Sequence, residues 1–84
     1  MPPENFIILA PRQAKPDEDI IFAINRSLAE EENITWTLAG ETLGSNNTLI
    51  HRFPKQGVYN IQAKISKDAL GVCERTQFLQ IAVG

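Results

Sequence analysis

Apolar and polar side chains alternate with a period of two along most of this chain. The alternation is clearest over Ile34–Leu38, where Trp36 stands between two threonines, and over Val58–Ile65, where Tyr59 begins an apolar face. Successive side chains of a β-strand point to opposite faces, so both segments are predicted to be half-buried strands. No segment shows three turns of helical periodicity, and the pattern therefore indicates an all-β protein.

Other short segments, some continuously apolar and some alternating, predict further strands. They are Phe6–Leu9, Asp19–Ile24, Leu49–Phe53 and Thr76–Val83. Pro11 and Pro16 interrupt the first part of the chain, which an edge strand tolerates and a central strand does not. Asp19–Ile24 is apolar on both faces, and its large Phe22 is expected to point inward.

Polar segments between the strands predict loops and turns. They are Asn25–Asn33, Gly40–Asn47, Lys55–Gly57 and Asp68–Gly71. Within the first of these loops, Ser27–Glu30 resembles a helix capping box, which allows a single helical turn. The acidic run Glu30–Glu32 is expected to be a solvated part of the same loop.

Strand number and chain length together define the expected architecture. The chain has 84 residues, which is the size of one small domain. Several short strands separated by turns favour an immunoglobulin-like sandwich over a barrel. We therefore predict a single domain over residues 1–84, folded as a two-sheet antiparallel sandwich of about seven strands. We expect it to be one domain of a larger multidomain protein.

Charge and composition narrow the choice of partners. The formal net charge is −2, and the eight lysines and arginines are scattered. Nucleic-acid-binding domains usually carry a basic stripe, so nucleic acid and anionic membranes are not expected partners. No apolar run approaches the roughly 20 residues that a membrane-spanning helix needs. Met1–Glu4 is acidic rather than basic, and no signal peptide is visible in this chain.

The chain offers little cysteine or metal chemistry. Cys73 is the only cysteine, which excludes an intrachain disulfide and any zinc site with two cysteine ligands. It is expected to be a free surface thiol, or to pair with a cysteine outside the chain. The acidic cluster Asp17–Asp19 makes Asp17 and Asp19 weak candidates for calcium ligands. The favoured interpretation is a solvated turn without a metal.

No set of catalytic residues can be recognised in the sequence. His51 is the only histidine, and a catalytic histidine needs an orienting carboxylate and a nucleophile within reach. Phosphate-binding loops and the usual hydrolase and metalloprotease sequences are absent. We therefore expect no enzyme activity and no cofactor, and a structural role for His51.

Spaced aromatic, histidine and glycine residues form a motif in the middle of the chain. It consists of Trp36-x-Leu38, a glycine-containing turn, and then His51-x-Phe53-x3-Gly57-x-Tyr59 before an alternating strand. The motif resembles the polycystic-kidney-disease (PKD) repeat, an immunoglobulin-like β-sandwich, although Gly40–Thr42 stands where that family has Gly-Asp-Gly. The resemblance implies structural roles for Trp36, His51, Phe53, Gly57 and Tyr59. Tyr59 also fits a tyrosine corner, whose hydroxyl bonds back to the backbone.

The resemblance also implies a function. PKD repeats are non-catalytic modules, so this chain is expected to be extracellular, at a cell surface or periplasmic, as a spacer or as a protein–protein or adhesion unit. Its partners would be other domains of the parent protein or another protein.

Two alternatives remain open. One is a carbohydrate-binding accessory module of a secreted enzyme, in which sugar rings would stack on exposed aromatic side chains. Only Phe6 and Phe78 look free of the core for such a role. The other is a domain of a larger secretion or surface assembly that adds a partner strand to one of its sheet edges.

Overall fold

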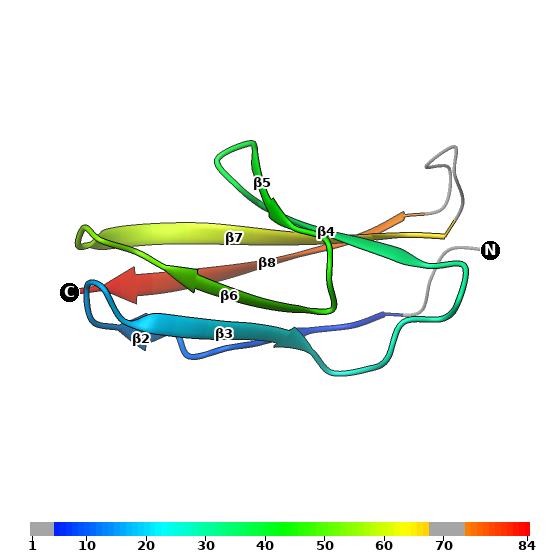
Figure 1. The fold of residues 1–84 in the computed structure, drawn as a ribbon, viewed down its shortest axis with the longest axis horizontal. Helices are drawn as coiled ribbons and strands as arrows, with labels where there is room; N and C mark the ends of the chain where they lie inside the picture. Colours follow the sequence, from blue (N-terminus) through cyan, green and yellow to red (C-terminus); the bar gives the residue numbers. More distant parts are fainter. Residues whose placement is uncertain (1–4, 68–73) are drawn as a thin grey trace.

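The structure is a computed structural model that describes residues 5–67 and 74–84, and strands are the regular elements of that part of the chain (Figure 1). The strands are β1 (Ile8–Leu9), β2 (Gln13–Ala14), β3 (Asp19–Ile24), β4 (Asn33–Leu38), β5 (Glu41–Gly44), β6 (Thr48–Arg52), β7 (Gly57–Ser66) and β8 (Glu74–Val83). The predicted all-β class is confirmed. Within the described ranges, no helix is long and apolar enough to cross a membrane.

The strands form two sheets. One has three strands in the order β1-β3-β6, and the other has five strands in the order β2-β8-β7-β4-β5. Every pair is antiparallel except β2 with β8, which is parallel. A short segment containing Pro11 separates β1 from β2, so the N-terminal run leaves one sheet and joins the other. A proline has no N–H to donate to a ladder, which accounts for the change of sheet at this point.

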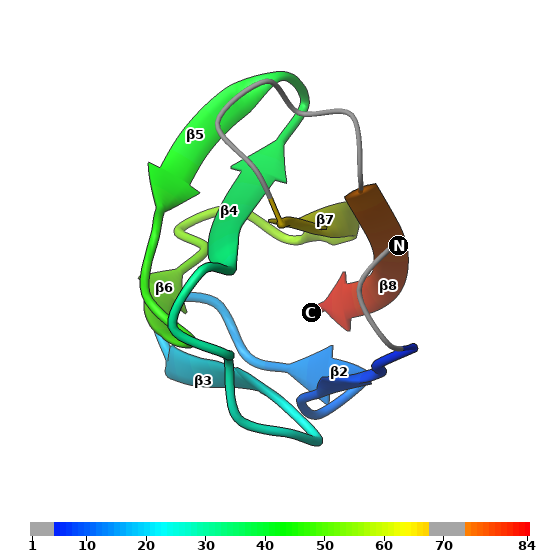
Figure 2. The same cartoon turned by 90° about the vertical axis from the view of Figure 1, so that its right-hand side faces the viewer.

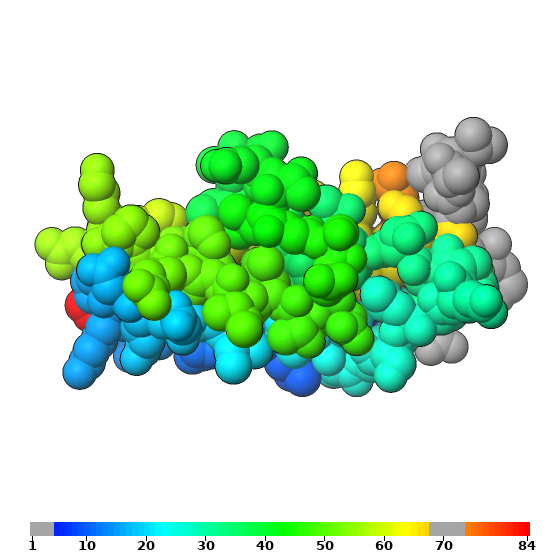
Figure 3. All heavy atoms as spheres, in the orientation of Figure 1, coloured from blue at the N-terminus to red at the C-terminus, as the bar shows by residue number. Residues whose placement is uncertain are grey.

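The two sheets pack face to face as the predicted immunoglobulin-like sandwich. Seen end-on, β4 lies across the sandwich from β3, and β5 approaches β6 along one side (Figure 2). In the space-filling view, the green residues of β5 and β6 cover that side of the molecule (Figure 3). With β1 and β2 counted as one interrupted strand, the architecture matches the predicted number of about seven.

Trp36 joins the two sheets. Its side chain is fully buried, and its ring lies against Phe22 of the opposite sheet, with ring centroids 6.2 Å apart and planes tilted by 50°. The indole Nε1 donates a 2.7 Å hydrogen bond to the backbone carbonyl of Asn46, so its buried N–H has a partner. The alternation over Ile34–Leu38 therefore predicted the inward face of β4 correctly.

The segment Gly40–Asn47 differs from the predicted loop. Glu41–Gly44 forms β5, which pairs with β4 in an antiparallel hairpin. The turn consists of Ala39 and Gly40, whose φ angles are 51° and 84°. Two successive positive φ angles are typical of a type I′ hairpin turn, where asparagine or glycine is usual. Because Ala39 gives no such signal, the sequence did not indicate the hairpin.

Two smaller expectations are also corrected. Phe6 is buried, with 1% of its surface exposed, and so is not free for a ligand. The helical turn allowed at Ser27–Glu30 does not form. The backbone there makes a tight turn instead, in which the N–H of Glu32 donates to the carbonyl of Ala29 at 3.0 Å.

Two replacements of Trp36 should destabilise the sandwich to different extents. Trp36→Ala is expected to lower the free energy of unfolding by about 3–5 kcal/mol, because it empties the space between the sheets. Trp36→Phe keeps a ring but loses volume and the bond to Asn46, and should cost about 2 kcal/mol. Urea unfolding followed by circular dichroism measures both. Equal stability of Trp36→Phe and the wild-type chain would contradict the role of the indole.

Ala39 should be a position where the chain gains stability. Ala39→Asn is expected to raise the free energy of unfolding by about 0.5–1 kcal/mol, because asparagine tolerates the left-handed conformation better than alanine. Ala39→Val should lower it by about 1 kcal/mol, because a β-branched side chain is strained there. Thermal melts of the three proteins give the order. If both variants have the melting temperature of the wild type, the turn assignment is wrong.

Candidate functional site

Most of the motif residues lie in the core or pack against it, whereas Gly57 is exposed. Trp36 and Phe53 are buried, His51 and Tyr59 are half-buried, and Gly57 begins β7. The Phe53 ring stacks on Tyr59 at a centroid distance of 4.4 Å and meets the edge of His51 at 4.7 Å.

The Tyr59 hydroxyl closes this aromatic cluster. It donates a 2.8 Å hydrogen bond to the backbone carbonyl of Lys55, so the predicted bond back to the backbone is confirmed. The bond ties the start of β7 to the turn that precedes it.

Asp17 and Asp19 of the acidic cluster make hydrogen bonds with neighbouring parts of the chain. Asp19 accepts a 2.9 Å hydrogen bond from Nε of Arg52 on the adjacent strand β6, and this bond lowers the pKa of Asp19. Asp17 has a φ of 63°, and its N–H donates to the carbonyl of Phe53.

In the described part of the chain, no three histidine, cysteine or acidic side chains lie close enough to hold a metal. The predictions for Cys73 and for the loop Asp68–Gly71 fall outside the described residues.

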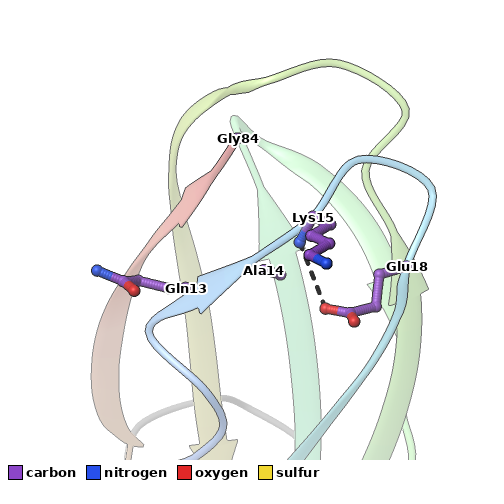
Figure 4. A pocket seen from close by; sticks show the side chains of 5 residues that line it. All are labelled: Gln13, Ala14, Lys15, Glu18 and Gly84. Atoms are coloured by element: carbon purple, nitrogen blue, oxygen red, sulfur yellow. Dashed lines mark hydrogen bonds between the residues drawn. The ribbon is translucent and has the colours of Figure 1, made fainter.

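One shallow hollow lies beside β2, with a volume of about 280 Å³. It is lined by Gln13, Ala14, Lys15, Glu18 and Gly84. Figure 4 shows Lys15 and Glu18 beside each other, with Oε1 of Glu18 accepting a 3.3 Å hydrogen bond from the backbone N–H of Lys15, while Gln13 points away. These lining residues include no histidine, serine or cysteine.

Glu32 corrects the prediction of a solvated acidic run. Its side chain is only 5% exposed, and its two carboxylate oxygens accept hydrogen bonds of 2.9 and 2.8 Å from the guanidinium of Arg26. Oε1 also accepts a 2.7 Å bond from the N–H of Ala29. The Arg26 bonds are the main reason that the pKa of Glu32 falls to about 2. The pair joins the two ends of the loop between β3 and β4.

The outer face of the three-stranded sheet carries a group of exposed aliphatic side chains. Four aliphatic side chains on it are 46–63% exposed: Ile7, Leu9, Ile21 and Ile50. Ile21 and Ile50 are direct partners across β3 and β6, and Leu9 pairs with Ala23 across β1 and β3. We call these four side chains with Ala23 the apolar face. The central strand of this sheet, β3, lies at the bottom of Figure 2.

The apolar face had a partial signal in the sequence. Asp19–Ile24 is apolar on both faces, which predicts outward aliphatic groups as well as inward ones. What the sequence did not show is the pairing of β3 with β6, which places Ile50 beside Ile21.

The outer face of the five-stranded sheet has a different character. Phe78 is 66% exposed and is the direct partner of Gln62 across β7 and β8. The pairs before and after it on the same face are Lys64 with Thr76 and Asn60 with Gln80. Since Phe6 is buried, Phe78 is the only phenylalanine, tyrosine or tryptophan among the described residues that is mostly exposed.

The Arg26–Glu32 pair predicts a specific loss of stability in acid. A carboxyl whose pKa falls from 4.5 to about 2 on folding stabilises the folded state above pH 4.5, and this contribution disappears as the pH falls towards 2. Its size is up to about 3 kcal/mol. Glu32→Gln should therefore be less stable than the wild type at pH 7 and nearly equal to it at pH 2, as measured by urea unfolding.

The exposed neighbour Glu31 provides the matched control. Glu31→Gln should follow the wild-type stability at every pH. A constant difference between Glu32→Gln and the wild type from pH 7 to pH 2 would contradict the assignment of the acid-sensitive contribution to Glu32.

Comparison with known proteins adds no family. No protein-family model matches this chain, and no curated protein matches it. The functional inference therefore depends on the two outer sheet faces and on the resemblance of the motif.

Proposed function

We propose that this chain is a non-catalytic module that makes protein–protein contacts through its apolar face. The observation that carries the proposal is the cross-strand pair Ile21 and Ile50, 58% and 63% exposed, with Ile7 and Leu9 on the same sheet. Contiguous apolar patches on the order of 300–600 Å² are often functional on soluble proteins. Single exposed aliphatic residues are common, but a group of them on one face is not.

The chemistry of the face favours a protein over other ligands. Aliphatic side chains donate and accept no hydrogen bonds, so they bind a sugar or a phosphate only weakly. The charged side chains of β3 and β6 on this face, Asp19 and Arg52, neutralise each other. A protein surface with apolar groups of its own is the complementary partner.

The proposal assigns the module no reaction. The groups best suited to acid–base work are engaged in the structure: His51 packs on Phe53, Asp19 binds Arg52, and Glu32 binds Arg26. By its resemblance to PKD repeats, the module would act as a spacer or adhesion unit in an extracellular, cell-surface or periplasmic protein. A neighbouring domain or another protein would cover the apolar face.

A second candidate function is carbohydrate binding on the five-stranded sheet. Phe78 offers one ring for stacking, and Asn60, Gln62 and Gln80 surround it with amide groups that can bond sugar hydroxyls. A single ring gives a smaller stacking surface than the apolar face gives a protein, so protein contact is the first choice.

Oxidative footprinting distinguishes the two candidates. The isolated chain and the same chain in intact cells of its own host are exposed to hydroxyl radicals, and oxidation is measured residue by residue. We expect oxidation of Ile21 and Ile50 to fall several-fold in the cells, because a partner excludes water from them, while Val58 and Phe78 stay reactive. Protection of Phe78 alone would favour the carbohydrate candidate. Equal oxidation in both settings would overturn the contact function.

A further inference from the structure

Resting on the proposed function of the apolar face, we propose that the partner seated on it is a second copy of this chain. The dimer has two-fold symmetry, with β3 of each copy lying over β6 of the other. The argument comes from the order of side chains on these two strands.

Apolar and charged groups stand in register on the outer sides of β3 and β6. Ile21 is opposite Ile50, and two residues along the strands Asp19 is opposite Arg52. Alternation places both pairs on the same face. The side chains of Asp19 and Arg52 are 60% and 57% exposed, so all four groups are available to a partner.

This order is self-complementary under one particular symmetry. A two-fold axis that runs parallel to the strands, between β3 and β6, places each strand over the other strand of the second copy. Ile21 then packs on the partner's Ile50. Asp19 faces the partner's Arg52, and the four charged groups alternate in sign. An axis along β3 itself would instead bring Asp19 onto the partner's Asp19.

Charge balance also favours a second copy. The chain has a net charge of −2, so two copies repel weakly overall. On the contacting strands this repulsion is absent, because one acidic and one basic side chain cancel. Matching patterns of opposite charge fix the register of an interface more than they add affinity.

The size of the face sets the strength of the dimer. The proposed axis brings Ile21 and Ile50 onto the partner and leaves Ile7 and Leu9 beside the contacting strands, so the buried apolar area is well below the roughly 800 Å² that each partner buries in a standard interface. The dimer should therefore be weak in free solution. It would become populated where copies are held close together, because tethering raises their effective concentration.

Sedimentation velocity of the whole chain tests the proposal. The weight-average sedimentation coefficient is expected to rise towards the dimer value between about 20 µM and about 1 mM. Ile50→Lys should abolish the rise. Val58→Lys is the matched control, because Val58 is a similarly exposed aliphatic residue on the other sheet, at 61% against 63%, and it should leave the rise unchanged. Circular dichroism melts check that both variants fold.

A mixing experiment tests the predicted pairing itself. Asp19→Arg carries two cations on its face and Arg52→Asp carries two anions, so each variant alone should stay monomeric. Mixed in equal amounts, they should associate at least as strongly as the wild type. If the wild type associates but the mixture does not, the arrangement of β3 over β6 is wrong.

The outcomes separate this inference from the function on which it rests. A chain that stays monomeric at every concentration overturns the second copy as partner. If Ile21 and Ile50 are nevertheless protected in cells, the contact function stands with a different partner. If Val58→Lys abolishes association and Ile50→Lys does not, the dimer contact lies on the five-stranded sheet. That result would overturn the inference.

Discussion

The burial of Trp36 between the two sheets is the contact on which the rest of this structure depends. Its ring packs on Phe22 of the opposite sheet, and its N–H holds the carbonyl of Asn46. Asn46 lies in the connection from β5 to β6, where the chain crosses between the sheets. One side chain therefore sets the spacing of the layers and also fixes the crossover that closes one side of the sandwich.

Filling the interior in this way determines what the exterior presents. Because side chains alternate along a strand, burying Phe22 obliges Ile21 and Ala23 to face outward. A one-residue slip would exchange the two sets and place Asp19 inside. The apolar face is thus a geometric consequence of the core register together with a sequence that is apolar at consecutive positions. Polar residues in the outward positions of β3 would have left the same fold without such a surface.

Local patterns predicted the fold well, and contacts between distant segments limited the prediction of the site. The inward faces of β4 and β7 follow from period-two alternation, which needs no knowledge of neighbours. The burial of Glu32 depends on Arg26 being brought beside it, and the face shared by Ile21 and Ile50 depends on strand pairing. Ala39 failed as a turn signal because its strained conformation is imposed by the hairpin rather than favoured by the residue.

The change of sheet at Pro11 makes the resistance of the sandwich to a pulling force depend on the direction of the pull. β2 runs parallel to β8, and the N–H groups of Ala82 and Gly84 donate to the carbonyls of Arg12 and Ala14. A pull applied at the N-terminal side of β2 and the C-terminal side of β8 acts along both strands and across these bonds. It loads them in shear, all at the same time, whereas a pull across the strands would open them one after another. Tension along the chain therefore meets the β2–β8 ladder in its most resistant orientation.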